Sequence, residues 1–582
     1  MSSRATFPIL ILLVLAAGAI PPVMRPWICD DAFITLRYVQ NACEGLGLVY
    51  NPGEHVEGYT HFLWTMFIWF FARLGLDPVL VATWLPVPFY IGTLWLLLRA
   101  SRALWPAPAR PKAMAWMALP VASCIWALHR DALVFATSGL ETSAYTCCLL
   151  LGFMLITTAA SARGRHAGIA AYALAALLRP EGLIHLGLGL VAMAPGGLHA
   201  APGDVTGRDG RKTDGRAHET ATGIPGRKDL AEFARASAIA FVLVAPLYVW
   251  RLLYYHDVLP NAFYAKSAGM AYWSQGWFYV GLYLRYYAAL GIAAVIGMLW
   301  VVRAKTRGPL VLAMAHALVI LLMTAYVGGD FMFARFLLPA TPFLALLAEH
   351  AVRSQKRWSL AWAALVILAT FAGGIWRERT LRWPEMPRGI TDERSVYPPE
   401  DVTARRVHGA RIAACFDSTD ASFLVLSAQA ALAYFARYPV AVEVNGLTDR
   451  ALARQPITTR GRPGHERKPT AEYFQERRIH FMVVHRHVAQ QRRYAWIRFG
   501  GLDGEIITYD RALMEQVRRR CKDVEFIDFP QYLDDYIRRA PDLAVDVLGR
   551  DLAEYRAYYF AHNQDPDRLA QLQAILRQKQ GR

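Results

Sequence analysis

Hydrophobic positions along the chain gather into long runs that short polar stretches separate. These runs lie near residues 7–24, 59–75, 79–98, 113–130, 138–158, 166–195, 232–254, 276–302, 309–327, 336–352 and 358–377. Most of them approach the roughly 20 residues that a helix needs to cross a bilayer. The pattern therefore predicts a polytopic α-helical membrane protein with about eleven transmembrane helices.

Two of the runs raise a local question. The run 166–195 is interrupted by "LLRPEGL" (177–183). Because proline removes a backbone donor and clashes with the preceding turn, this run is either one kinked helix or two short ones. The run 7–24 follows a single cation, Arg4, and precedes no small-residue cleavage site. We therefore expect a retained helix there, not a secretory signal.

The pattern changes after residue 377. Shorter apolar stretches such as "FLVLSAQAALAYF" and "HFMVVHRH" now alternate with polar sequence. This predicts a mixed α/β domain over 378–582 that follows a membrane domain over 1–377. The Gly-, Arg- and Asp-rich stretch 197–231 has no such period and predicts a flexible loop.

Composition and charge fix the class and suggest a topology. Of the 582 residues, 55% are hydrophobic and 19% charged, which is too apolar for a soluble protein. Lys and Arg give a net charge of +17, and basic loops at 161–166, 303–308 and 352–358 indicate the cytoplasmic side. Residues 25–58, 255–275, 328–335 and the C-terminal domain then lie outside, although the basic loop 99–112 conflicts with simple counting. We expect membrane lipids, not nucleic acid, as partners of this charge.

The seven cysteines include no CxxC pair, so the sequence does not indicate a zinc knuckle. Cys29 with Cys43, and Cys415 with Cys521, can form disulfides if their loops face an oxidising compartment. Unpaired thiols are the alternative.

Asp30 and Asp31 stand side by side just after the first apolar run. Asp30 can cap an interfacial helix over about 31–43 that Gly45 and Gly47 end. A cap needs only one aspartate, and successive side chains on a helix diverge by about 100°. The second carboxylate therefore needs another partner. One can act as a general base while the other holds a metal or a sugar hydroxyl.

Other charged side chains lie in loops beside the apolar runs. "NPGEHVEGYTHF" (51–62) supplies Glu57, Tyr59 and His61, with a solvated loop as the structural alternative. "SGLETSAY" (138–145) places Glu141 at the edge of an apolar run, where a carboxylate is a functional candidate. Arg179, in "LLRPEGL", can pair with Glu141 or with Glu181 for purely structural reasons.

Two further loops carry cations. Asn261, Tyr264 and Lys266 lie in one outer loop that suits a lipid phosphate, with an aromatic belt and a snorkelling lysine as the alternative. "YVGGDFMFARFLLP" (326–339) adds Asp330 and Arg335, the second phosphate candidate. Carboxylates and cations thus converge on one face beside the bilayer. That combination fits transfer of a group from a lipid-phosphate donor to an acceptor hydroxyl.

The motifs "DDAFITLRYVQN", "GLGLVYNPGEHVEGYTHFLWT", "SGLET", "LLRPEGL", "LPNAFYAKS", "GGDFMFARFLLP" and "VNGLTDRALA" occur in this order. Together they resemble the bacterial terminal arabinofuranosyltransferases, which are integral-membrane glycosyltransferases of GT-C type. The resemblance implies a GT-C fold with eleven helices and a periplasmic cap, in the cytoplasmic (inner) membrane. It also implies a decaprenylphosphoryl-arabinofuranose donor and a cell-envelope glycan acceptor.

The resemblance also implies roles for matching residues. Asp30 would be the base on the acceptor hydroxyl, with Asp31 beside it, and Lys266 and Arg335 would flank the donor phosphate. The remaining donor-side candidates are Tyr264, Asn261, Glu141 and Arg179, and the acceptor-side or site-lining candidates are Glu57, Tyr59, His61 and Asp330. A divalent cation (Mg, Mn or Ca) at Asp30 and Asp31 stays open, and no organic cofactor is expected.

Three other readings stay open. The same scaffold could use lipid-linked mannose, glucose or aminoarabinose, on a lipid, polysaccharide or protein acceptor. A lipid-linked glycan flippase would predict internal repeats and broken helices that meet at mid-membrane, which we do not detect in the sequence. A non-enzymatic assembly protein would tolerate loss of both aspartates.

Overall fold

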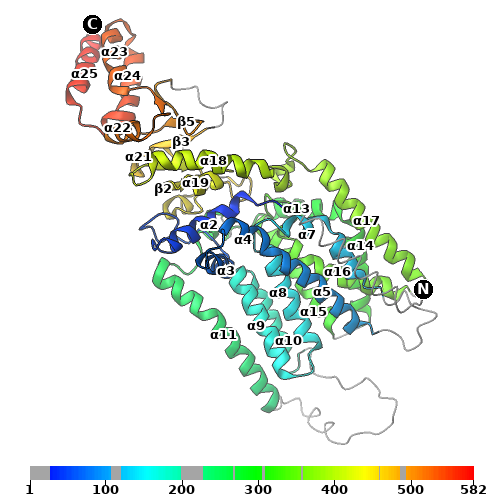
Figure 1. Cartoon of the computed structure of the whole chain (residues 1–582). Coiled ribbons are helices and arrows are strands. Elements are labelled where there is room, and N and C mark those ends of the chain that lie inside the picture. Colours follow the sequence, from blue (N-terminus) through cyan, green and yellow to red (C-terminus); the bar gives the residue numbers. More distant parts are fainter. Residues whose placement is uncertain are drawn as a thin grey trace, which may run out of the picture. The chain divides into compact units, whose positions relative to one another are not determined.

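The computed structural model of the chain describes residues 26–106, 119–197, 227–266, 269–304, 308–355, 358–457, 459–484 and 493–581. The chain divides into two compact units (Figure 1). The first comprises Met1–Ala32, Thr60–Leu259 and Ser267–Tyr397, and the second Phe33–Tyr59, Pro260–Lys266 and Pro398–Arg582. The predicted helix 7–24 and residues 198–226 of the predicted flexible loop lie outside the described residues.

The first unit is helical. Its helices are α3 (Phe62–Arg73), α4 (Pro78–Trp84), α5 (Pro86–Leu104), α6 (Val121–Leu128), α7 (Arg130–Phe135), α8 (Thr142–Thr158), α9 (Ala162–Leu178), α10 (Gly182–Met193), α11 (Arg227–Tyr255), α13 (Trp273–Tyr286), α14 (Ala288–Arg303), α15 (Pro309–Val327), α16 (Thr341–Ser354) and α17 (Ser359–Thr380). Short 3₁₀ turns lie at Leu338–Ala340 (η2) and Glu393–Ser395 (η5).

Several of these helices have the length and apolar composition of membrane spans. Among the described residues, four qualify by length and composition: Pro78–Leu104, Arg227–Tyr255, Pro309–Val327 and Ser359–Thr380. The pair α13 and α14 makes a fifth if it counts as one broken span, and α3, α8 and α10 are shorter apolar helices. The unit is therefore that of a multi-pass helical membrane protein, while the number eleven stays a prediction.

The apolar run 166–195 forms two helices, α9 and α10, which was one of the two predicted alternatives. The break contains Pro180, and α10 then packs back onto α9 (Figure 1). A Cβ at Gly182 would lie 2.5 Å from the backbone of Ala175, so the close return needs glycine.

The run 276–302 was predicted as a single helix, and this is wrong. α13 and α14 meet at Tyr287 with a bend of 103°. The Tyr287 hydroxyl donates a hydrogen bond to Asp131, which anchors the bend in the helical core. Hydropathy could not reveal it because the residues on both sides of the bend are apolar.

The second unit is of mixed α/β type, as predicted for the C-terminal region. A six-stranded sheet has the order β2-β1-β3-β5-β4-β6, in which β1 runs parallel to β2 and β3 and the other pairs are antiparallel. Its strands are β1 (Ser422–Val425), β2 (Val440–Glu443), β3 (Phe481–Val483), β4 (Trp496–Phe499), β5 (Leu502–Ile506) and β6 (Glu525–Phe526). The helices are most of α2 (Asp30–Cys43), α12 (Asn261–Ala265), α18 (Pro399–Phe416), α19 (Ala430–Phe435), α20 (Arg450–Ala453), α21 (Ala471–Glu476), α22 (Arg511–Arg520), α23 (Phe529–Arg539), α24 (Val545–Tyr555) and α25 (Pro566–Gln580).

One of the two candidate disulfides is present. Cys415 of α18 is bonded to Cys521, directly after α22. Cys29 instead has a free, buried thiol, so the Cys29–Cys43 bridge is not formed. The two residues flank the length of one helix, which separates them by roughly 20 Å. A disulfide needs α-carbons within about 7 Å.

The two units divide at Tyr397, not at the predicted boundary 377/378. The segment 378–397 belongs to the first unit because its backbone is tied to the loop that carries Arg335. Thr391 N donates to Phe331 O and Phe333 N donates to Thr391 O, both at 3.0 Å. Residues 33–59 and 260–266, predicted as membrane-domain loops, belong to the second unit.

Candidate active site

The aspartate pair begins α2 beside the "SGLE" turn. Cys29 N donates a hydrogen bond to Ser138 O at 2.9 Å. Gly139 has φ of 81°, and a Cβ there would lie 2.8 Å from Ile28 Cγ1 and 2.9 Å from Ala32 Cβ. Only glycine permits this approach. The turn therefore brings Glu141 to the same region as the start of α2.

Asp30 and Asp31 differ in burial and in the strength of their effect on nearby groups. α2 begins at Asp30, one residue before the predicted start, so Asp30 lies in the first turn. Asp30 is buried and Asp31 half-buried. Burial raises the pKa of Tyr397, and the charges of Asp30 and then Glu393 raise it further. The charge of Asp31 raises the pKa of Tyr397 less than that of Asp30 does, and it also helps to raise the pKa of Arg335. Which aspartate is the general base, and which holds a metal or a sugar hydroxyl, stays a prediction.

Glu141 is the centre of a buried ion cluster. Its Oε1 lies 3.5 Å from both Arg335 Nη2 and Arg179 Nη1, and its Oε2 lies 3.6 Å from His61 Nδ1. Burial raises the pKa of Glu141, but Arg335, His61 and Arg179 together outweigh it and hold the pKa at about 2. Glu141 is thus a permanent anion that holds two guanidinium groups.

Arg335 is buried between carboxylates. Its Nη1 lies 3.4 Å from Asp330 Oδ2, on the side away from Glu141. Burial lowers the pKa of Arg335, but Glu141, Asp330 and Asp31 raise it above its ordinary value. The loop reaches this position through Gly328 and Gly329, which have φ of 95° and 74°.

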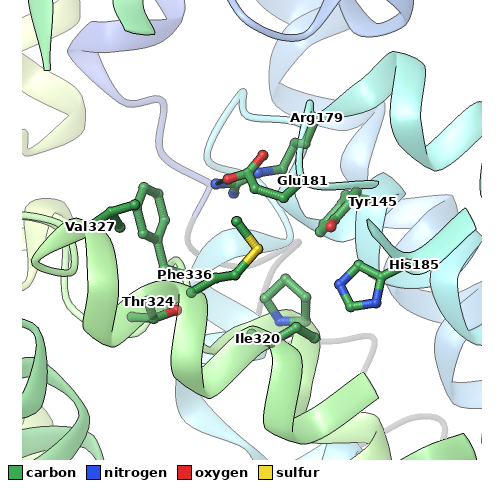
Figure 2. A pocket seen from close by; sticks show the side chains of 10 residues that line it. Tyr145, Arg179, Glu181, His185, Ile320, Thr324, Val327 and Phe336 are labelled. Carbon is green, nitrogen blue, oxygen red and sulfur yellow. Dashed lines mark hydrogen bonds and ion pairs between the residues drawn. The ribbon is translucent and has the colours of Figure 1, made fainter. Parts of the chain in front are cut away.

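Arg179 extends the cluster into a small cavity. It lies at the break between α9 and α10, with its Nη2 2.9 Å from Glu181 Oε1. Its guanidinium stacks over the rings of Phe336 at 4.8 Å and Tyr145 at 5.5 Å. The cavity has a volume of about 40 Å³. Figure 2 shows its wall, which is formed by Tyr145, Arg179, Glu181, His185, Ile320, Met323, Thr324, Val327, Phe336 and Pro339.

Five sequence-predicted residues, from four separate segments, therefore meet in one cluster of the first unit. They are His61, Glu141, Arg179, Asp330 and Arg335. Two guanidinium nitrogens in this cluster are buried and make no hydrogen bond within the described residues: Arg335 Nε, and Arg179 Nη1, which has only the 3.5 Å ion pair with Glu141. Such unfilled donors suit an oxyanion.

The remaining predicted residues belong to the second unit. Asn261 N donates to Glu57 O at 2.8 Å, and the Asn261 side chain donates to Gly446 O at 2.9 Å. Tyr264 lies under the guanidinium of Arg454 at 4.1 Å. Asn261 therefore has a structural role, in which it holds α12 on the "NGLTD" segment.

Lys266 and Tyr59 also have neighbours within the second unit. Lys266 follows α12, and its aliphatic stem passes Gly464. The Tyr59 ring meets that of Tyr38 edge-on at 5.0 Å. The predicted grouping of Lys266 with Arg335 around one phosphate stays a prediction.

The described residues do not fit a preformed metal site. No group of three or more His, Cys, Asp or Glu side chains among them could hold a metal ion. Mg²⁺ and Ca²⁺ need six or more oxygen ligands, which the two adjacent aspartates alone do not supply. A cation at Asp30 and Asp31 stays a prediction through which no chemical step is derived.

The chain resembles two terminal β-(1→2)-arabinofuranosyltransferases in sequence. It is 29% identical over 426 residues to the one from Corynebacterium glutamicum, which covers 64% of this chain and 55% of that protein. It is 27% identical over 430 residues to the one from Mycobacterium tuberculosis, which covers 64% and 62%. The chain is a distant homologue of these transferases. It spans little more than half the length of the first, and no family model matches it.

The fold resembles that of ArnT from Cupriavidus metallidurans in the apo state. The two structures align with a TM-score of 0.50 and 12% identity, over 88% of this chain and 99% of that one. At this identity the likeness shows the fold alone. It confirms a membrane architecture like that of ArnT, in agreement with the GT-C fold that the resemblance implied.

Sequence reasoning missed a second buried ion cluster. Arg377 has no exposed surface and lies 2.6 Å from Asp131 and 2.5 Å from Asp392. Asp392 directly follows Thr391, which is bonded to the Arg335 loop. The signal was an arginine inside the last apolar run and an aspartate at the edge of another. Neither showed its partner.

Proposed function

We propose that this protein is a membrane glycosyltransferase. It transfers arabinofuranose from a polyprenyl-phosphate donor, decaprenylphosphoryl-arabinofuranose, to a hydroxyl of a cell-envelope glycan on the periplasmic face. Distant homology to two arabinofuranosyltransferases supports the chemistry. The structural observation that carries the proposal is the pair of buried cations Arg335 and Arg179 around Glu141, in which Arg335 Nε has no hydrogen-bond partner among the described residues.

In the proposed reaction the donor phosphate is the leaving group. Arg335 and Arg179 offset the negative charge that develops on it, which is usually the largest contribution to such catalysis. Glu141 keeps the two guanidinium groups together before the donor arrives. The anomeric carbon gains oxocarbenium character as the bond to phosphate lengthens.

Asp30 removes the proton of the acceptor hydroxyl as that oxygen attacks the anomeric carbon. Such base catalysis contributes roughly 10²–10⁴-fold. The first turn of α2 favours the ionised carboxylate that a base requires. Attack from the face opposite the phosphate inverts the configuration.

The location of the C-terminal unit has independent support. Its disulfide between Cys415 and Cys521 is of a kind that persists in oxidising compartments such as the bacterial periplasm. That compartment also holds the acceptor glycan in this proposal.

A panel of donors tests the proposal. The full chain in lipid vesicles is given polyprenyl-phosphate arabinofuranose, mannose, glucose or aminoarabinose together with an arabinan acceptor, and the product is identified by mass. We expect transfer from the arabinofuranose donor. Transfer from another donor would keep the enzyme class and replace the sugar. No transfer from any of them, by protein that binds the donor, would contradict the proposal.

A further inference from the structure

Three buried polar side chains form a continuous series of hydrogen bonds, and one of the three lines the cavity of Figure 2. His185 Nδ1 lies 2.7 Å from His316 Nδ1, and His316 Nε2 lies 2.6 Å from the hydroxyl of Tyr172. The three residues come from α10, α15 and α9, and each is at most 1% exposed. Of the three, His185 lines the cavity, next to Tyr145.

Packing fixes the positions of these rings. A Cβ at Gly152 or Gly189 would lie within 2.9 Å of the Tyr172 ring, so two glycines make the slot in which Tyr172 lies. His316 stacks on Phe343 with ring centroids 4.9 Å apart. Packing therefore holds the three rings in position. What it leaves open is which nitrogen of each imidazole carries the proton and where the Tyr172 O–H points.

The positions of the protons give this series of hydrogen bonds a direction, from Tyr172 through His316 to His185. We treat both imidazoles as neutral, because an isolated charge within a helical bundle is costly. The Tyr172 hydroxyl has one hydrogen-bond partner, His316, in the part of the chain that the structure describes. Its proton must point to His316 Nε2, since otherwise a buried donor would be unsatisfied. His316 then carries its own proton on Nδ1 and donates it to His185 Nδ1.

The direction of the hydrogen bonds determines which ring nitrogen of His185 carries the proton. Because His185 Nδ1 is the acceptor, the neutral ring carries its proton on Nε2. That N–H finds no acceptor among the described residues, and His185 lines the cavity next to Tyr145, across from the guanidinium of Arg179. Polar links between membrane helices explain the contact of Tyr172 with His316. They do not explain why His185 joins the same series of hydrogen bonds while its Nε2–H donates to no described residue.

We propose that His185 Nε2–H donates a hydrogen bond to a phosphate oxygen of a lipid-phosphate headgroup that enters this cavity, which Arg179 lines from another wall. His316 and Tyr172 are positioning residues that hold His185 in the donating tautomer. The lipid source of the phosphate rests on the proposed function, whereas the direction of the hydrogen bonds does not. No proton is transferred along the chain and no covalent bond changes in it.

The size of the cavity limits how much of this ligand can enter, and the carboxylate of Glu181, paired with Arg179, lines the same wall. A volume of about 40 Å³ holds about three waters, so only the edge of a headgroup enters. A hydrogen bond from a neutral donor strengthens as negative charge grows on the oxygen that accepts it. His185 therefore contributes more to a phosphate that is leaving than to one that is only bound.

Histidine tautomers can be read directly by nitrogen NMR. The full chain, labelled with [¹⁵N]histidine in nanodiscs, should show His316 protonated at Nδ1 and His185 protonated at Nε2. His185→Phe and His316→Phe assign the signals. Tyr172→Phe removes only the hydroxyl and should release the fixed tautomer of His316. Tyr90→Phe is the matched control, because Tyr90 is equally buried and bonds only a backbone carbonyl. Protonation of His316 at Nε2 in the unmodified chain would overturn the inference.

Phosphate probes and kinetics test the ligand. Undecaprenyl phosphate should shift the His185 Nε2 signal and leave the signals of histidines outside the cavity unchanged. An equal shift with inorganic phosphate alone would overturn the lipid source, and no shift with either would overturn the phosphate assignment.

In the transfer assay, His185→Phe should lower kcat roughly tenfold with little change in KM for the donor. A change in KM alone would contradict a role at the leaving phosphate. If the tautomers and the phosphate shift are as expected while no donor supports transfer, the proposed function fails and this inference stands.

Discussion

Arg335 Nη2 lies 3.5 Å from Glu141 Oε1, although the two residues are 194 positions apart in the chain. Glu141 ends the "SGLE" turn that packs on the first turn of α2, and Arg335 lies in the loop between α15 and η2. This contact therefore joins the segment that carries the aspartate pair to the segment that carries the proposed phosphate cation. Its loss should affect both stability and donor binding.

Glu141→Gln should destabilise the protein strongly, because it leaves two buried guanidinium groups without their shared anion. Breaking a buried ion pair costs roughly 3–5 kcal/mol. The matched control is Glu232→Gln, which removes a more exposed partner of Arg165 and should cost about 1 kcal/mol or less. Thermal unfolding of the two variants in the same detergent gives the comparison. Equal losses would show that Glu141 is not the centre of the cluster.

The contribution of Glu141 to the free energy of unfolding should be lost at acidic pH. Its pKa is about 2 in the folded protein and 4.5 ordinarily, so its ion pairs stabilise the fold above 4.5. That stabilisation should disappear as the pH falls from 4.5 towards 2. The difference in unfolding free energy between the unmodified chain and Glu141→Gln should thus be constant from neutral pH to about 5 and then shrink. A difference that shrinks already near neutral pH would contradict the low pKa.

Asp30→Asn should abolish transfer and leave donor binding intact, since the amide cannot accept the hydroxyl proton. The expected loss is roughly 10²–10⁴-fold in kcat. Asp31→Asn should instead weaken donor binding, because Asp31 acts on Arg335. Asp567→Asn makes the same change in the first turn of α25, at an exposed position, and serves as the control. Full activity of the Asp30 variant would exclude Asp30 as the base.

Arg377→Gln should loosen the segment 387–397. The variant removes the buried cation between Asp131 and Asp392, so Asp392 loses the partner that fixes this segment. Hydrogen exchange of the amides of Phe333 and Thr391 should become faster, because the two residues bond across the same segment. Arg394→Gln, which breaks a partly exposed pair with Glu378, is the control and should change exchange much less. Unchanged protection in Arg377→Gln would show that Asp392 does not hold the segment.

The disulfide predicts a simple chemical result. In the unfolded chain isolated without reductant, Cys415 and Cys521 should resist alkylation until a reductant is added. Cys415→Ser should lower the stability of the second unit by roughly 2–4 kcal/mol. Alkylation of both residues without reductant would show that the bond is absent in that preparation.

Many of the individual residues of the site could be predicted from the sequence. The contacts between them could not. Glu141, Arg179 and Arg335 stood out in the sequence because a charge at the edge of an apolar run is costly and needs a reason. That Arg179 and Arg335 share one oxygen of Glu141 depends on long-range packing, which hydropathy does not encode. His185 and His316 gave no signal, since a single histidine in an apolar helix forms no pattern. Asn261 was assigned to the donor because its loop is rich in donors, whereas its amide groups are used by the backbone of the second unit.

Gly139 makes the spacing between the carboxylates adjustable without any change of charge. A methyl group there would overlap Ile28 and Ala32, which normal carbon contacts of about 3.5–4.0 Å would force apart by roughly 1 Å. Displacements of about that size can cost 10²-fold in rate. Gly139→Ala should therefore change the spacing of the active-site groups and not their charge. It would reveal how sharply the chemistry depends on distance, because it shifts the active-site groups without removing any ionisable side chain.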